Sequence, residues 1–98
     1  MKVRILVSKT RNSDNDKDEL YATVFYNEFE IANVYLKATK ETEYMYPNLT
    51  VNTLPTELYT RYKKEISDKV HKIYNMIKRH TEDSFTGVFD EWLKEDYE

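Results

Sequence analysis

The chain has 98 residues, of which 40% are hydrophobic and 34% are charged, and its formal net charge is −3. This length suits a single domain, and this share of hydrophobic residues excludes intrinsic disorder. The absence of cysteine excludes disulfides, zinc–thiolate centres, iron–sulfur clusters and thiol nucleophiles. No apolar run is long enough for a signal peptide or a membrane-spanning helix, so we expect an intracellular, cytoplasmic protein with no membrane partner.

Apolar residues occur at every second position in two segments, a pattern that is typical of half-buried strands. The first segment has Val3, Ile5 and Val7, and the second has Leu20, Ala22, Val24 and Tyr26. The polar residues 9–18 between them predict a flexible hairpin loop. Asn27-Glu28 predicts a tight two-residue turn to a third strand, because Asn tolerates the left-handed backbone conformation.

The third strand changes parity along its length. Phe29 and Ile31 are expected to point inward, but the later apolar residues Val34 and Leu36 have the opposite parity. We therefore expect either a β-bulge near Ala32-Asn33 or a strand that is apolar on both faces. A fourth short strand, residues 43–46, is expected to end at Pro47, because proline cannot donate a ladder hydrogen bond.

From Pro55 onward the apolar period changes to that of helices. The first stripe consists of Leu58, Tyr62, Ile66, Val70, Ile73 and Ile77. Thr81 is a plausible N-cap for a second helix over residues 82–97, whose stripe consists of Phe85, Val88, Phe89, Trp92 and Leu93. The sequence therefore predicts an α+β domain, an antiparallel four-stranded β-meander followed by two amphipathic helices in the order ββββαα.

Charge separates the two parts of this domain. Residues 1–80 contain 14 Lys or Arg against 11 Asp or Glu, whereas residues 81–98 contain one Lys against seven acids. We expect a mildly basic body, residues 1–80, with an acidic and aromatic C-terminal helix packed on it or appended to it. The acidic segment is either a solvated helix face or a device that screens a basic surface on this chain or on a partner.

The sequence does not contain an arrangement that is typical of an active site. His71 and His80 have no metal ligands at a suitable spacing, and the single glycine, Gly87, leaves no phosphate-binding loop or oxyanion turn. We therefore expect a protein that is not an enzyme and that needs no metal, cofactor or small-molecule substrate.

Binding surfaces are the alternative to catalysis. The expected strands carry Tyr21, Tyr35, Tyr44 and Tyr46, which either stack on unpaired bases, anchor a protein interface or pack across strands. The basic residues that we consider for nucleic-acid binding are Arg61, Lys64, Lys72, Lys78 and Arg79. Glu57, Glu65 and Asp68 lie among them, so the helix does not form a strong phosphate-binding stripe.

The order of these residues resembles the SpoVG family, small bacterial regulators of septation and sporulation. Val3-Arg4-Ile5 resembles its first strand, residues 21–34 its central hairpin, Tyr46-Pro47 its Met-Pro, and Leu54-Pro55 the entry to its helix. The resemblance implies a homodimer joined through its sheets that binds DNA or RNA. The family has a basic Ser-Lys-Arg after the Met-Pro, whereas residues 48–53 of this chain contain no basic residue.

Two functional hypotheses follow from these observations. The first is a small SpoVG-like nucleic-acid-binding regulator that acts as a dimer. The alternative is a phage-type or mobile-element-type protein–protein interaction module or inhibitor that uses the acidic C-terminal helix. Its expected contact residues are Phe85, Phe89, Asp90, Glu91 and Trp92.

Overall fold

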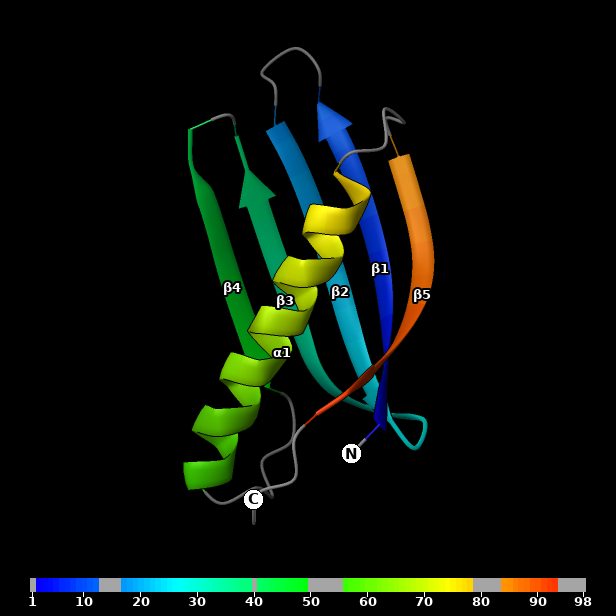
Figure 1. The fold of residues 1–98 in the computed structure, drawn as a ribbon, viewed down its shortest axis with the longest axis vertical. Helices are drawn as coiled ribbons and strands as arrows, with labels where there is room; N and C mark the ends of the chain where they lie inside the picture. Colours follow the sequence, from blue (N-terminus) through cyan, green and yellow to red (C-terminus); the bar gives the residue numbers. More distant parts are fainter. Residues whose placement is uncertain (1, 13–16, 40, 50–55, 79–83, 94–98) are drawn as a thin grey trace.

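The computed structural model consists of one antiparallel sheet and one helix. It describes residues 2–12, 17–39, 41–49, 56–78 and 84–93. The elements are β1 (Lys2–Asn12), β2 (Lys17–Tyr26), β3 (Phe29–Ala38), β4 (Glu43–Leu49), α1 (Thr56–Ile77) and β5 (Ser84–Trp92). The five strands lie in the order β4-β3-β2-β1-β5, and α1 crosses one face of the sheet diagonally (Figure 1).

The predicted order ββββαα is wrong, because the described residues form five strands and a single helix. The error lies in the C-terminal segment, where Phe85, Val88 and Trp92 have helical spacing but lie in β5. Phenylalanine, threonine, valine and tryptophan favour strands, and Gly87 weakens a helix. The free edge of β1 accepts this segment, and nine residues of β5 pair with β1. Residues 94–98 of the expected helix lie outside the described residues.

The core fills the space between α1 and the sheet face that it covers. The buried strand residues on this face are Val3, Ile5, Val7, Leu20, Ala22, Val24, Ala32, Val34, Leu36 and Ala38. The helix contributes Tyr62, Ile66, Val70, Ile73, Tyr74 and Ile77. The alternation predicted for the first two strands is confirmed except at Tyr26, which is 38% exposed. The apolar stripe predicted for the first helix is confirmed, except that the side chain of Leu58 lies outside the described part.

The β2–β3 hairpin closes through the predicted two-residue turn. Tyr26 pairs with Phe29, and Asn27 and Glu28 have positive φ angles of 50° and 70°. Positive φ at both central residues matches the right-handed twist of the strands. The prediction of an inward Phe29 is wrong, because this side chain is 74% exposed.

β3 contains a β-bulge, which is one of the two alternatives that the sequence predicts. Because of the bulge, the later apolar residues of β3 point toward the core. Ala32 pairs with Val24 and Glu30 pairs with Phe25, so Ile31 is the extra residue. The bulge therefore lies next to the predicted position. β4 does not end at Pro47 as predicted: Pro47 lies opposite Val34, and the strand continues to Leu49. Proline is tolerated there because β4 is an edge strand.

A buried polar cluster lies where a flexible loop was predicted. β1 continues to Asn12 and β2 begins at Lys17, so only residues 13–16 of the expected loop remain outside the described residues. Asp18 is buried, accepts a hydrogen bond from the Tyr74 hydroxyl at 2.9 Å, and lies 3.3 Å from the Arg11 guanidinium. Burial and the Asp18 carboxylate raise the pKa of Tyr74. Within the described residues, no helix is long and apolar enough to cross a bilayer.

Two neighbouring residues of β1 test which sheet face is covered. Ile5 is fully buried, whereas Leu6 on the opposite face is 42% exposed. We expect Ile5→Ala to lower the free energy of unfolding by about 2–5 kcal/mol and Leu6→Ala to lower it by less than about 1 kcal/mol. Urea denaturation of both variants measures the difference. Equal losses would contradict the assignment of the two faces.

Tyr74→Phe tests the buried cluster. The variant loses the hydrogen bond to Asp18, and we expect it to be less stable at neutral pH by roughly 1–2 kcal/mol. Because the folded-state pKa of Tyr74 is raised, its contribution to stability is complete below about pH 10 and is lost as the pH rises further. The stability difference between wild type and variant, measured by urea denaturation, should therefore shrink above about pH 10. A difference independent of pH would argue against a raised pKa.

Candidate functional site

The sheet face opposite α1 is the most distinctive surface of the molecule, and no described element covers it. We call it the open face. Strand register aligns three of its tyrosines directly across β2, β3 and β4, because Tyr21 pairs with Tyr35 and Tyr35 pairs with Tyr46. We call these three residues the tyrosine row. Tyr21 and Tyr46 are 55% and 56% exposed, so the row is a surface feature.

The rings of the tyrosine row stack on one another. The ring centroids of Tyr21 and Tyr35 are 4.9 Å apart with an interplanar angle of 26°, and those of Tyr35 and Tyr46 are 5.8 Å apart at 17°. Tyr35 therefore has an aromatic neighbour on the strand at either side. Such cross-strand pairs stabilise a sheet. Stacking also orders these side chains before any partner arrives, which lowers the entropy lost on binding.

A carboxylate on β2, Glu19, holds the hydroxyl group of Tyr21 in the tyrosine row. Glu19 accepts a hydrogen bond from the Tyr21 hydroxyl at 3.5 Å and lies 2.8 Å from the Lys17 ammonium. The hydrogen bond from Lys17 holds the pKa of Glu19 below its usual value. Partial desolvation and the negative charge of Glu19 raise the pKa of Tyr35. The Lys17–Glu19 ion pair therefore contacts the tyrosine row at Tyr21, on the β2 side.

Beyond the row, the open face combines apolar side chains with hydroxyl and amide groups. Val88, Leu6, Thr23, Asn33 and Asn48 lie side by side across the five strands. The exposed large apolar residues that lie on this face are Leu6, Tyr21, Tyr44, Tyr46, Val88 and Trp92. Tyrosine and tryptophan mixed with serine, threonine and asparagine are typical of surfaces that contact proteins.

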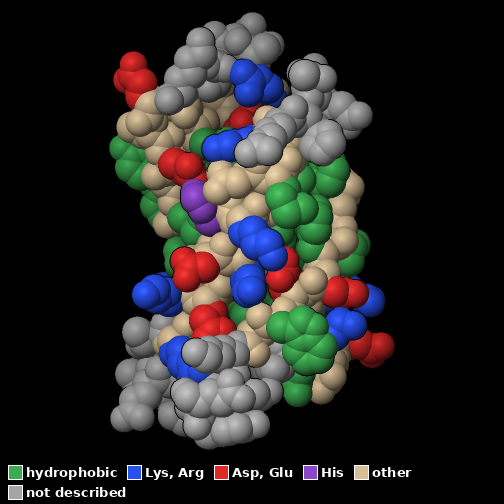
Figure 2. Space-filling model, in the orientation of Figure 1, with side chains coloured by type: hydrophobic (Ala, Val, Ile, Leu, Met, Phe, Trp, Pro, Cys, Tyr) green, Lys and Arg blue, Asp and Glu red, His purple; other side chains and the backbone are tan. Residues whose placement is uncertain are grey.

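Three of the candidates for nucleic-acid binding, Arg61, Lys64 and Lys72, lie on α1, on the other side of the sheet from the tyrosine row, and Lys78 directly follows this helix. The Arg61 guanidinium is 3.3 Å from Glu65, and the Lys72 ammonium is 3.2 Å from Glu91. Lys64 is exposed, Lys78 lies 5.6 Å from the centre of the Tyr74 ring, and Arg79 lies outside the described residues. Figure 2 shows basic and acidic side chains interleaved over this face. The structure therefore does not bring these candidates together into one basic stripe.

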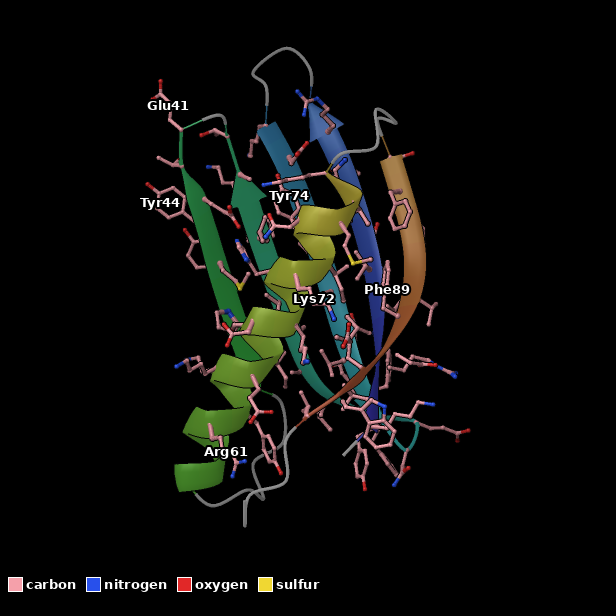
Figure 3. All side chains as sticks on the ribbon, viewed as in Figure 1. Glu41, Tyr44, Arg61, Lys72, Tyr74 and Phe89 are labelled. Atoms are coloured by element: carbon pink, nitrogen blue, oxygen red, sulfur yellow. The ribbon has the colours of Figure 1, made fainter. Side chains whose placement is uncertain are left out.

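The candidates for protein contact are divided between the two faces of β5. Phe85 and Phe89 point toward the helix side, with ring centroids 6.3 Å apart, and pack against the core. Figure 3 shows Phe89 beside the upper half of α1. Glu91 lies on the same side and forms ion pairs with Lys69 at 3.8 Å and Lys72 at 3.2 Å. The acidic segment thus neutralises basic residues of its own chain.

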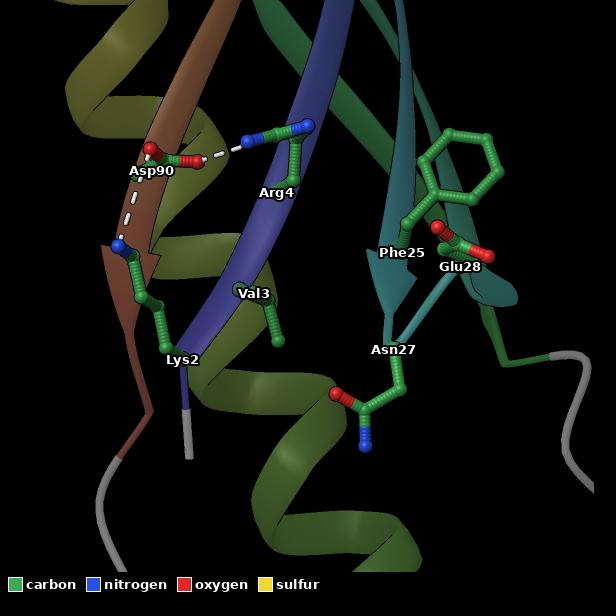
Figure 4. A pocket seen from close by; sticks show the side chains of 7 residues that line it. All are labelled: Lys2, Val3, Arg4, Phe25, Asn27, Glu28 and Asp90. Atoms are coloured by element: carbon green, nitrogen blue, oxygen red, sulfur yellow. Dashed lines mark hydrogen bonds and ion pairs between the residues drawn. The ribbon is translucent and has the colours of Figure 1, made fainter.

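Asp90 and Trp92 lie on the opposite side of β5. Asp90 lies 3.3 Å from the Arg4 guanidinium and 4.0 Å from the Lys2 ammonium (Figure 4). These three residues line a shallow pocket of about 510 Å³ together with Val3, Phe25, Asn27 and Glu28. Its cations already have a carboxylate partner, and its described lining lacks the nucleophile and base pair that a catalytic site needs.

The sequence provided the tyrosines but not their arrangement. Residues 21, 35 and 46 belong to three strands, and only the register shows that they are aligned. The contribution of Glu19 and Lys17 was missed, because both fall in or next to the stretch expected to be a loop. Comparison of the chain with protein-family models, curated proteins and solved structures gave no match.

Glu19→Gln tests the link between the carboxylate and the tyrosine row. Removing the negative charge should lower the pKa of Tyr35, because the charge of Glu19 and its hydrogen bond are among the causes that raise it. Titration of the tyrosine ring carbons by NMR measures this pKa. Asp68→Asn on α1, which removes the same charge on the other side of the molecule, is the control and should leave the titration of Tyr35 unchanged. An unchanged pKa in Glu19→Gln would contradict the link.

Proposed function

We propose that this protein is a protein-binding module whose contact surface is the open face of the sheet. The observation that carries the proposal is the preordered tyrosine row on a face that no described element covers. Tyrosine and tryptophan are the residues that most often dominate binding energy at protein interfaces. Val88 and Leu6 add exposed apolar area to the same face, with exposed fractions of 57% and 42%.

The stacking geometry favours a protein partner over nucleic acid. A base that binds to a sheet stacks on a free aromatic ring face. Tyr35 has a ring stacked on each side, so its faces are already occupied. The outer faces of Tyr21 and Tyr46 are then the only ring faces of the row that remain for a base.

The ion pairs of the molecule also favour a protein partner over nucleic acid. Phosphate binding requires cations that are free to replace counterions. Seven of the described cations already lie within 4.0 Å of a carboxylate. They are Lys2, Arg4, Arg11, Lys17, Arg61, Lys69 and Lys72.

The second candidate is the SpoVG-like regulator that binds DNA or RNA as a cytoplasmic dimer. The observation in its favour is that Lys64 and Lys78 are exposed and have no ion-pair partner among the described residues. The hypothesis of an inhibitor that uses an acidic C-terminal helix is withdrawn, because residues 84–92 form β5. The protein-binding hypothesis remains, with its surface moved from that segment to the open face.

Site-specific photo-crosslinking in the native cells tests the proposal. A benzophenone amino acid replaces Tyr44, which is 51% exposed on the open face and outside the tyrosine row, or Lys64 on α1 as the control position. We expect a discrete protein adduct from position 44 and none from position 64. Tyr46→Ser, which shortens the row, should weaken the adduct at position 44.

Nucleic acid is the alternative outcome of the same experiment. Adducts that nuclease removes, together with a gel shift of DNA or RNA that weakens steeply as salt rises, would replace the proposal by the SpoVG-like regulator. Equal protein adducts from positions 44 and 64 would also contradict the proposal, because proteins would then contact α1 as readily as the open face.

A further inference from the structure

We infer that the protein partner presents a carboxylate to Lys37, a cation of the open face that has no ion-pair partner among the described residues. Lys37 lies on β3, two residues beyond Tyr35. It is directly opposite Glu19 on β2 and Tyr44 on β4. Glu19 nevertheless pairs with Lys17, at 2.8 Å. The inference rests on the proposed function, because it names the chemistry that the same partner offers at this face.

Strand register divides the open face into rows that cross the sheet. Two central rows contain no charged side chain. They consist of Thr86, Ser8, Tyr21, Tyr35 and Tyr46, and of Val88, Leu6, Thr23, Asn33 and Asn48. A row with Glu19 and Lys37 borders this uncharged centre on one side. A row with Arg4 and Asp90 borders it on the other side.

The uncharged centre is too small to form a whole interface. Strands lie about 4.8 Å apart and alternate residues of one strand about 6.8 Å apart, so two rows across five strands cover roughly 330 Å² in projection. A stable interface buries about 800 Å² of accessible surface on each partner. A partner that docks on the open face therefore also covers at least one of the bordering rows and has to accommodate its charges.

The two bordering rows place different demands on the partner. Arg4 lies 3.3 Å from Asp90, so an uncharged surface can cover that row without leaving a lone charge. Lys37 has no such counter-charge, and it is already half-buried in the free chain. Covering an ammonium group further without a partner is strongly unfavourable. A carboxylate of the partner at this position removes the penalty.

An isolated cation is better suited to a single carboxylate than to nucleic acid. A phosphate backbone carries a charge at every nucleotide and needs several free cations along its path. The neighbours of Lys37 along β3 and across to β4 are Tyr35 and Tyr44, and tyrosine is typical of protein interfaces. An acidic side chain of a protein therefore matches this part of the open face.

The open face of a second copy does not offer a free carboxylate for Lys37. The described acids on this face are Glu19, Glu30 and Asp90, and each already has an interaction within its own chain. Moving one of them to Lys37 would leave another group without its partner. We therefore assign the carboxylate to a different protein.

Carbodiimide coupling in a lysate of the native cells tests the contact directly. The reagent joins an amine to a carboxylate where the two are in close contact, so it identifies the acid that pairs with Lys37. We expect tryptic peptides in which the side chain of Lys37 is joined to Asp or Glu of another protein. Lys64 is the matched control, because it is exposed on α1 and has no ion-pair partner among the described residues. It should form no such product.

Affinity measurements test what the charge contributes. The partner is identified from the photo-adduct at position 44 and purified, and isothermal titration calorimetry gives its affinity for each variant. Lys37→Met should weaken binding at least about tenfold, because the acid of the partner is then covered and unpaired. Lys37→Arg keeps the charge and should retain most of the affinity. Lys64→Met should bind as wild type does, and circular dichroism checks that every variant is folded.

Four results would overturn the inference. They are coupling of Lys37 to Glu19 of its own chain, coupling of Lys37 to a second copy, equal coupling of Lys37 and Lys64, and a folded Lys37→Met variant that binds as tightly as wild type. A mixture of chains of two isotopic masses distinguishes the first result from the second. Any of the four together with an intact adduct at position 44 would refute only this inference. Absence of that adduct would refute the proposed function and this inference with it.

Discussion

The single helix covers only one of the two faces of the five-stranded sheet. This difference between the faces determines where the core lies and which side chains remain exposed. The covered face is built from small and branched apolar side chains that pack beneath Ile66, Val70 and Ile73. Their burial provides the main driving force for folding. The other face has no such cover among the described residues and must therefore be stable in water or be covered by a partner.

The open face meets this requirement with tyrosine and with paired charges. Tyrosine has a large apolar ring and a hydroxyl that remains hydrated, so the stacked row buries ring area without a dry layer above it. Lys17 with Glu19 and Arg4 with Asp90 pair opposite charges on this face. A face that is aromatic and preordered, and on which carboxylates already pair with cations, is better suited to a protein surface than to a phosphate backbone.

Much of the fold could be predicted from local patterns, and the part that could not depended on tertiary contacts. Alternation in β1 and β2, the turn at Asn27-Glu28 and the stripe of α1 are properties of short segments, and all three were predicted. β5 was mistaken for a helix because its apolar spacing fits both periods, and the free edge of β1 decides between them. Pairing across the sheet likewise decided the position of the bulge.

The candidate site was less predictable than the fold for the same reason. The sequence singled out Tyr21, Tyr35 and Tyr46, but an aligned row exists only once three strands are in register. The basic residues of α1 were considered as phosphate ligands, yet Lys72 is neutralised by Glu91 of β5, 19 residues away in the sequence. Such pairing cannot be read from the order of charges along one helix.

The most direct test of the central claim is hydroxyl-radical footprinting of the purified chain and of the same chain in its native cells. The account predicts that Tyr44, Tyr46 and Trp92 are modified readily in the purified chain and are protected in cells. Met76, which is 51% exposed on α1, should be modified equally in both. The protection should survive nuclease treatment of the lysate. Equal modification of the open face in both settings, or protection that nuclease abolishes, would contradict the account.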